Sequence, residues 1–92
     1  MKLNPETKKH YLKTWPEFFK AIKSRKKRFE IRLNDRDYRV NDILILQEWN
    51  PNTQKYTGSN DIYVLVTYVL AERPWVPDGY VCMSINIIGD VY

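Results

Sequence analysis

The sequence predicts an α+β, mainly β fold: a small, partly closed barrel of about five short strands with one helix packed across one opening. Several short segments rich in β-branched and aromatic residues alternate between apolar and polar positions, as strands do. One segment has the cap signals and apolar spacing of a helix. The chain has 92 residues, enough for a single hydrophobic core, so residues 1–92 are predicted to form one domain.

The predicted helix begins within the sequence TWPE. Thr14 and Glu17 have the spacing of a capping box, in which each side chain bonds the other residue's backbone N–H, and Pro16 suits the first helical turn. One apolar stripe follows: Phe18, Phe19 and Ile22. The cations after this stripe suit a helix end near residue 24 or 25, and a short strand over 10–13 is predicted before the helix.

Residues 27–33 alternate with a period of two and predict the next strand. Apolar side chains share one face: Phe29, Ile31 and Leu33. Charged side chains share the other face: Arg28, Glu30 and Arg32. We expect the charged face to point outward to solvent. The sequence NDRD at 34–37 predicts a turn, because Asn and Asp side chains bond to nearby backbone groups.

Three further strands are predicted along the rest of the chain. Residues 43–49 are apolar on both faces at first, as in a strand covered on both sides, and 50–58 read as a hairpin loop. Residues 61–70 form a long β-branched and aromatic strand, and 71–79 form a loop with two prolines. In the last strand, 80–88, the residues expected to point inward are Val81, Met83, Ile85 and Ile87.

Charge is distributed unevenly along the chain. Residues 1–36 contain twelve Lys or Arg and four Asp or Glu, whereas residues 37–92 contain three and seven. Five cations fall within positions 23–28, more than a helix dipole explains, and an anionic partner would relieve their repulsion. The alternative is a solvated helix end. The predicted nucleic-acid-binding residues are Lys23, Arg25, Lys26, Lys27, Arg28, Glu30, Arg32 and Arg36.

Glu30, between Arg28 and Arg32, allows two interpretations. One is an exposed ladder of ion pairs, worth roughly 0–1 kcal/mol. The other is a binding site in which Glu30 holds the Arg32 guanidinium toward a phosphate or base edge and itself accepts hydrogen bonds from the ligand. His10 is expected to be a structural hydrogen-bonding residue. Four aromatic residues suit either a core position or stacking on bases: Tyr11, Trp15, Tyr38 and Trp49.

The sequence lacks the signals of several classes of functional site. Cys82 is the one cysteine, so we expect neither a disulfide within the chain nor a Cys-based metal site. The three glycines are isolated, which leaves no glycine-rich phosphate loop, and no metal or other cofactor is expected. No apolar run is long enough for a signal peptide or a membrane span, so we expect a cytoplasmic protein without a membrane partner.

A short motif carries a family resemblance. Lys27, Glu30 and Arg32 match the last three residues of the ASCH pattern Gly, any, Lys, any, any, Glu, any, Arg, and Arg25 stands where the pattern has Gly. With this motif and the sequences NDRDY and NDILIL downstream, residues 10–87 resemble small bacterial and phage proteins of the ASCH and PUA-like superfamily. The resemblance implies RNA binding, a PUA-like β-barrel of five to six strands, and a cleft beside the helix lined by the motif residues. Arginine in place of the glycine makes the turn costlier, because glycine readily adopts a left-handed conformation.

Three functional hypotheses follow. The preferred one is a non-catalytic module that binds single-stranded RNA or a nucleotide in the cationic cleft. The second, implied by the resemblance, is an amidohydrolase acting on a modified nucleoside such as acetylcytidine, with Lys27 and Glu30 as its catalytic residues; the acetylcytidine hydrolases have Thr in place of Glu30. The third is a phage or bacterial protein that inhibits a nucleic-acid enzyme through a protein contact at the 71–79 loop, which contains Trp75.

Overall fold

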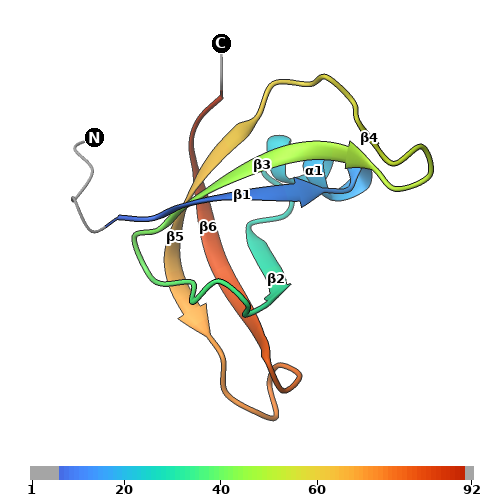
Figure 1. The fold of residues 1–92 in the computed structure, drawn as a ribbon. Helices are drawn as coiled ribbons and strands as arrows, with labels where there is room; N and C mark the ends of the chain where they lie inside the picture. The colour runs from blue at the N-terminus through green and yellow to red at the C-terminus, as the bar shows by residue number, and fades with distance from the viewer. Residues whose placement is uncertain (1–6, 91–92) are drawn as a thin grey trace.

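The computed structural model describes residues 7–90, which form a small mainly β domain with six strands in one sheet and one short helix (Figure 1). No helix in this part of the chain is long and apolar enough to cross a membrane. The elements are β1 (Lys9–Thr14), α1 (Pro16–Lys23), β2 (Phe29–Leu33), β3 (Ile43–Asn50), β4 (Lys55–Tyr56), β5 (Ile62–Leu70) and β6 (Tyr80–Asp90).

The sheet has the strand order β1-β3-β5-β6-β2, and the two-residue β4 pairs with β3 outside this path. β1 runs parallel to β3, and the other pairs are antiparallel. β1 and β2 are therefore the two ends of the described sheet. Two side chains cross between these ends: Arg32 Nη2 donates to Thr14 Oγ1 at 3.2 Å, and Arg36 Nη1, just after β2, donates to the Tyr11 carbonyl at 3.2 Å. Closure into a barrel stays a prediction.

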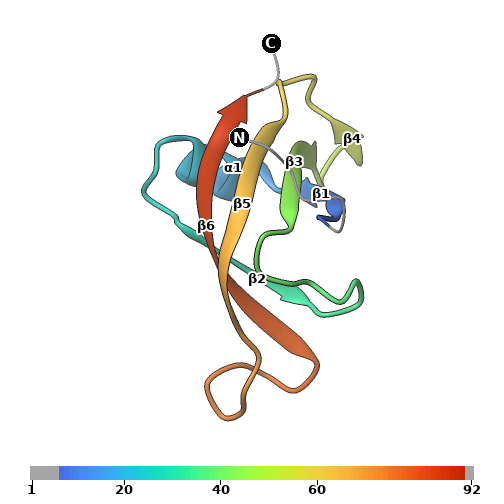
Figure 2. The same ribbon diagram turned by 90° about the vertical axis from the view of Figure 1, so that its left-hand side faces the viewer.

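The hydrophobic core lies between the inner face of the sheet and α1. Fully buried aliphatic side chains from β3, β5 and β6 form its centre, and α1 adds Phe19 and Ile22. In β6, the predicted inward residues Val81, Met83 and Ile85 are buried, which confirms the orientation of that strand. β5 and β6 continue as a hairpin, and its 71–79 loop lies away from α1 (Figures 1 and 2).

α1 begins at Pro16, within the predicted sequence TWPE, but its cap differs from the prediction. Trp15 is the N-cap residue, and no side chain caps the helix, so the capping box predicted from Thr14 and Glu17 is wrong. Thr14 instead ends β1, pointing inward, and its hydroxyl donates to the Leu12 carbonyl at 3.4 Å. The predicted helix end is confirmed, because α1 ends at Lys23 and the next residue forms its C-cap.

The two faces of β2 are the reverse of the prediction. Glu30 is buried, at 3% exposed. The apolar residues of the strand lie on the solvent side: Phe29, Ile31 and Leu33 are 44%, 52% and 52% exposed. The pairing with β6 explains this result, since Glu30 lies opposite Met83 and Arg32 opposite Val81, both inward residues of β6. Directly paired residues share a face of the sheet, so the charged face of β2 points inward.

Candidate functional site

A hollow of about 410 Å³ lies where β1, α1 and β2 meet, at the unpaired ends of the sheet. We call it the aromatic pocket. β1 and its junction with α1 supply Lys13, Thr14 and Trp15, and the first turn of α1 supplies Phe18. Lys27 and residues 29–32 complete the lining. Three of these side chains are aromatic and four are charged, so the pocket combines flat apolar surface with charge.

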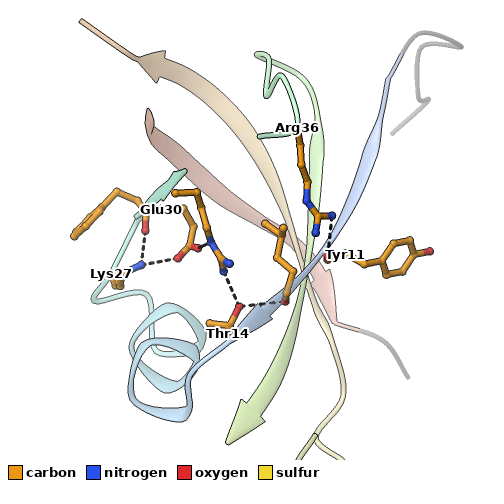
Figure 3. A network of polar contacts seen from close by, with 8 residues as sticks. Tyr11, Thr14, Lys27, Glu30 and Arg36 are labelled. Carbon is orange, nitrogen blue, oxygen red and sulfur yellow. Dashed lines mark hydrogen bonds and ion pairs between the residues drawn. The ribbon is translucent and has the colours of Figure 1, made fainter. Parts of the chain in front are cut away.

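Glu30 is the centre of an ion cluster in this pocket. Its Oε1 accepts a hydrogen bond from Lys27 Nζ at 2.6 Å, and its Oε2 accepts one from Arg32 Nε at 2.9 Å (Figure 3). The Glu30 side chain is 4% exposed, and those of Lys27 and Arg32 are 16% and 24% exposed. A buried carboxylate is costly unless it is paired, and here two cations pair with it, leaving the cluster with a net charge of +1.

Both oxygens of Glu30 are thus occupied by the protein's own cations. The sequence-based interpretation gave Glu30 two roles, holding Arg32 and accepting hydrogen bonds from a ligand. The structure shows the first, because Glu30 Oε2 accepts a hydrogen bond from Arg32 Nε, and the second stays a prediction. Glu30 therefore orients the two cations within the lining of the pocket.

Lys27 and Arg32 keep hydrogen-bond donors for a ligand. Lys27 Nζ also donates to the Phe29 carbonyl at 2.7 Å, and Arg32 Nη2 donates to Thr14 Oγ1 at 3.2 Å. An ammonium group has three N–H donors and a guanidinium has five, so these contacts leave donors on both side chains. The cluster therefore presents positive charge and N–H groups to an acceptor-rich ligand.

Aromatic rings flank these cations. Lys27 Nζ lies 4.8 Å from the centroid of the Phe29 ring and 5.6 Å from that of Phe18, within the range of cation–π attraction. Trp15 and Phe18 lie nearly parallel, with ring centroids 6.2 Å apart. All three rings are exposed, so they offer flat apolar surface to a ligand.

The basic turn, residues 24–28, connects α1 to β2 and includes Lys27. Arg25, which the sequence resemblance aligned with a glycine, has φ +65°, a left-handed conformation that is unusual for a residue with a side chain. The N–H groups of Lys26 and Lys27 both donate to the Ala21 carbonyl, which ends the helix without using a charged side chain. The side chains of Arg25, Lys26 and Arg28 are exposed, and none forms an ion pair with an acidic residue within 7–90.

Comparison with known protein families identifies the family of this chain. The family model described as a domain of unknown function, DUF3850, matches residues 9–85, most of the chain. The protein belongs to the DUF3850 family. The matched segment contains every residue that lines the aromatic pocket. No curated protein matches the chain.

The DUF3850 domain brings together some of the predicted site residues and separates others. Lys27, Glu30 and Arg32 form one cluster, and Trp15 lies beside it. Arg36 instead donates to the backbone of Tyr11, whose exposed ring is outside the pocket lining. Lys23 is exposed at the end of α1. Trp49, another predicted stacking residue, is on β3, and Lys13 Nζ lies 4.7 Å from the centroid of the Trp49 ring.

Of the two alternatives left open for Tyr38, a core position and stacking on bases, the structure shows the core position. The residue is 5% exposed, and its ring packs edge-on against His10, with centroids 4.8 Å apart. Burial raises the pKa of the Tyr38 hydroxyl above its ordinary value. His10 Nε2 lies 2.9 Å from Asp42 Oδ2, and Asp42 Oδ2 also accepts a hydrogen bond from the Arg39 N–H. This arrangement agrees with the structural role expected for His10.

Sequence reasoning missed Phe18 and Phe29 as parts of the site. Both were assigned to buried apolar faces, but the 15, 18 spacing places Trp15 and Phe18 one helical turn apart and was a usable signal. It also missed Glu48, a buried carboxylate on β3 that accepts hydrogen bonds from the hydroxyls of Thr57 and Ser59 at 2.6 and 2.8 Å. No group of His, Cys, Asp or Glu side chains suited to a metal ion occurs within residues 7–90.

Proposed function

We propose that this DUF3850 domain binds single-stranded RNA or a nucleotide in the aromatic pocket. The observation that carries the proposal is the Glu30 cluster, in which a buried carboxylate holds Lys27 and Arg32 beside exposed rings. A nucleotide offers the two features that such a pocket complements: a flat base and negatively charged or carbonyl oxygens.

The physical argument rests on stacking and on donor supply. Stacking of a base on an aromatic side chain is worth about 1–3 kcal/mol and requires no particular base. With the oxygens of Glu30 paired internally, the remaining N–H groups of Lys27 and Arg32 suit phosphate oxygens or base carbonyls. The volume of the hollow, about 410 Å³, is within the range of small-ligand sites.

The proposal includes a fold and a location. We take the domain as a PUA-like barrel of the ASCH type, closed between β1 and β2 by the side chains of Arg32 and Arg36 rather than by backbone pairing. The aromatic pocket would then be the cleft that the family resemblance implies. A cytoplasmic location fits this role, because the lone Cys82 suits a reducing compartment.

The geometry favours binding over the amidohydrolase alternative. Lys27 Nζ donates to both the Glu30 carboxylate and the Phe29 carbonyl, which is the arrangement of a fixed cation rather than of a general base with a free nitrogen. Incubation of the protein with acetylcytidine, followed by mass spectrometry, checks this preference. We expect no release of acetate, and turnover abolished by Lys27→Ala would instead support the enzyme.

Fluorescence anisotropy with a short labelled single-stranded RNA tests the binding proposal. We expect affinity to fall several-fold from low to physiological salt, because bound phosphates release counterions. Arg32→Ala should weaken binding about ten-fold, equivalent to about 1.4 kcal/mol. The matched control is Arg39→Ala, which removes an exposed arginine already paired with Asp37 outside the pocket. Equal affinities for the two variants, or no binding by the wild type at low salt, would overturn the proposal.

A protein contact at the 71–79 loop is the second candidate function. Trp75 in this loop is 74% exposed, whereas its neighbour Val76 is buried. Exposed tryptophans often anchor protein interfaces. Trp75→Ala should leave RNA affinity unchanged, and a loss of RNA binding in this variant would place the RNA site on the loop instead.

A further inference from the structure

A second hollow adjoins the aromatic pocket and shares one wall with it. This hollow, about 370 Å³, lies between the basic turn and β6. Lys27 lines both hollows. The Ile85 N–H donates to the Arg28 carbonyl at 3.1 Å, which fixes the turn against β6, and the two segments lie side by side in Figure 2. We call this second space the basic hollow.

The two hollows differ in chemistry. The basic hollow is lined by three cations, Arg25, Lys27 and Arg28, together with Asn86 and isoleucine side chains. Its lining includes neither a carboxylate nor an aromatic ring. It therefore offers charge and amide groups but no stacking surface, whereas the aromatic pocket offers three rings.

The turn is held mainly by backbone hydrogen bonds. The last carbonyls of α1 accept backbone N–H groups from residues 24–27. Arg28 Nε donates to the Arg25 carbonyl at 3.0 Å, which leaves the terminal nitrogens of its guanidinium unused, and Arg25 is held in a left-handed conformation with its side chain exposed. Two guanidinium groups on a fixed turn, without an acidic partner in the described chain, are suited to bind an anion.

From this juxtaposition we infer that the ligand is an extended single strand of more than one nucleotide, with a base in the aromatic pocket and the phosphate of a neighbouring nucleotide in the basic hollow. This inference rests on the proposed function and specifies its ligand. A paired base in a duplex has its faces covered by stacking and cannot enter the pocket. Lys27, between the two hollows, contacts the strand where base and backbone meet.

The test compares uridine 5′-monophosphate with the tetranucleotide of uridine at low salt, using competition against a labelled tetranucleotide. We expect the tetranucleotide to bind about ten-fold or more tightly than the monophosphate, because it reaches both hollows. The double variant Arg25→Ala/Arg28→Ala should lose most of this difference and keep its affinity for the monophosphate within about two-fold. The control Lys9→Ala/Lys55→Ala removes the same charge from exposed positions outside both hollows.

A second variant tests the inference while keeping the backbone conformation of the turn. Arg25→Gly removes one guanidinium but places glycine at a position with φ +65°, which suits glycine better than arginine, so the turn stays intact. It should also weaken binding of the tetranucleotide and leave binding of the monophosphate unchanged.

The outcomes separate the inference from the proposed function. Equal affinity for the two ligands, or a tetranucleotide advantage that survives loss of both arginines, would overturn the inference while the aromatic pocket still binds nucleotides. Failure of both ligands to bind the wild type would overturn the proposed function and the inference together.

Discussion

Glu30 shows how one buried side chain organises the site. An unpaired carboxylate in this position would be strongly unfavourable, so Lys27 and Arg32 stabilise it, and in turn it fixes both cations at the pocket wall. The grouping of these three residues was predictable from the sequence, because they lie close together with suitable spacing. The inward direction of the Glu30 side chain was not predictable, because a period of two shows which residues share a face but not which face meets the core.

Glu30→Gln should destabilise the protein. The substitution removes the negative charge and leaves two partly buried cations without a partner, at a cost of roughly 3 kcal/mol, the low end for a broken buried pair because both cations still reach water. Urea denaturation at neutral pH measures the change. The control is Glu72→Gln at an exposed position in the 71–79 loop. A loss no larger than that of the control would contradict the buried-cluster description.

Tyr38 gives the protein a pH dependence on the alkaline side. Burial raises the pKa of its hydroxyl in the folded state. The folded state thus holds this proton more tightly than the unfolded state, so its contribution to stability is complete below about pH 10 and is lost as pH rises through the folded-state pKa. The urea midpoint should fall less steeply between about pH 9 and 11 in Tyr38→Phe than in the wild type. Tyr56→Phe, at an exposed position, should retain the wild-type slope.

At the scale of elements, most strands and the helix followed from local pattern. The inward residues of β6 and the end of α1 were predicted correctly, because their apolar alternation and cap region reflect local physics. The cap of α1 was predicted wrongly, because Thr14 belongs to β1 and its hydroxyl accepts a hydrogen bond from Arg32 on β2, 18 positions away. The two faces of β2 were also predicted the wrong way round, because they depend on the register of β2 with β6, which is a long-range property.

The inverted strand makes a testable prediction about stability. Leu33→Ala should change the free energy of unfolding by less than about 1 kcal/mol, because Leu33 is 52% exposed. Leu46→Ala on β3 should cost about 2–5 kcal/mol, because that side chain is fully buried and its removal leaves a cavity. Urea denaturation of the two variants compares them directly. Similar losses would show that the apolar face of β2 packs against the core.

At the scale of the whole molecule, the site lies where the sheet is incomplete. β1 and β2 end the described sheet, and the aromatic pocket occupies the region between them and the start of α1. The charge asymmetry of the sequence pointed to the half of the chain that contains both the motif and the basic turn. The division into an aromatic and a basic hollow depends on how three elements pack, which no local pattern encodes.

The most direct measurement is NMR of the three tryptophan indole N–H signals during titration with a short single-stranded RNA, with assignments from single Trp→Phe variants. Trp15 lines the aromatic pocket, whereas Trp75 lies in the 71–79 loop outside both hollows. We predict that the Trp15 signal shifts with the bound fraction and that the Trp75 signal does not move. A shift of Trp75 with Trp15 unchanged, or no shift at all, would contradict nucleotide binding in the aromatic pocket.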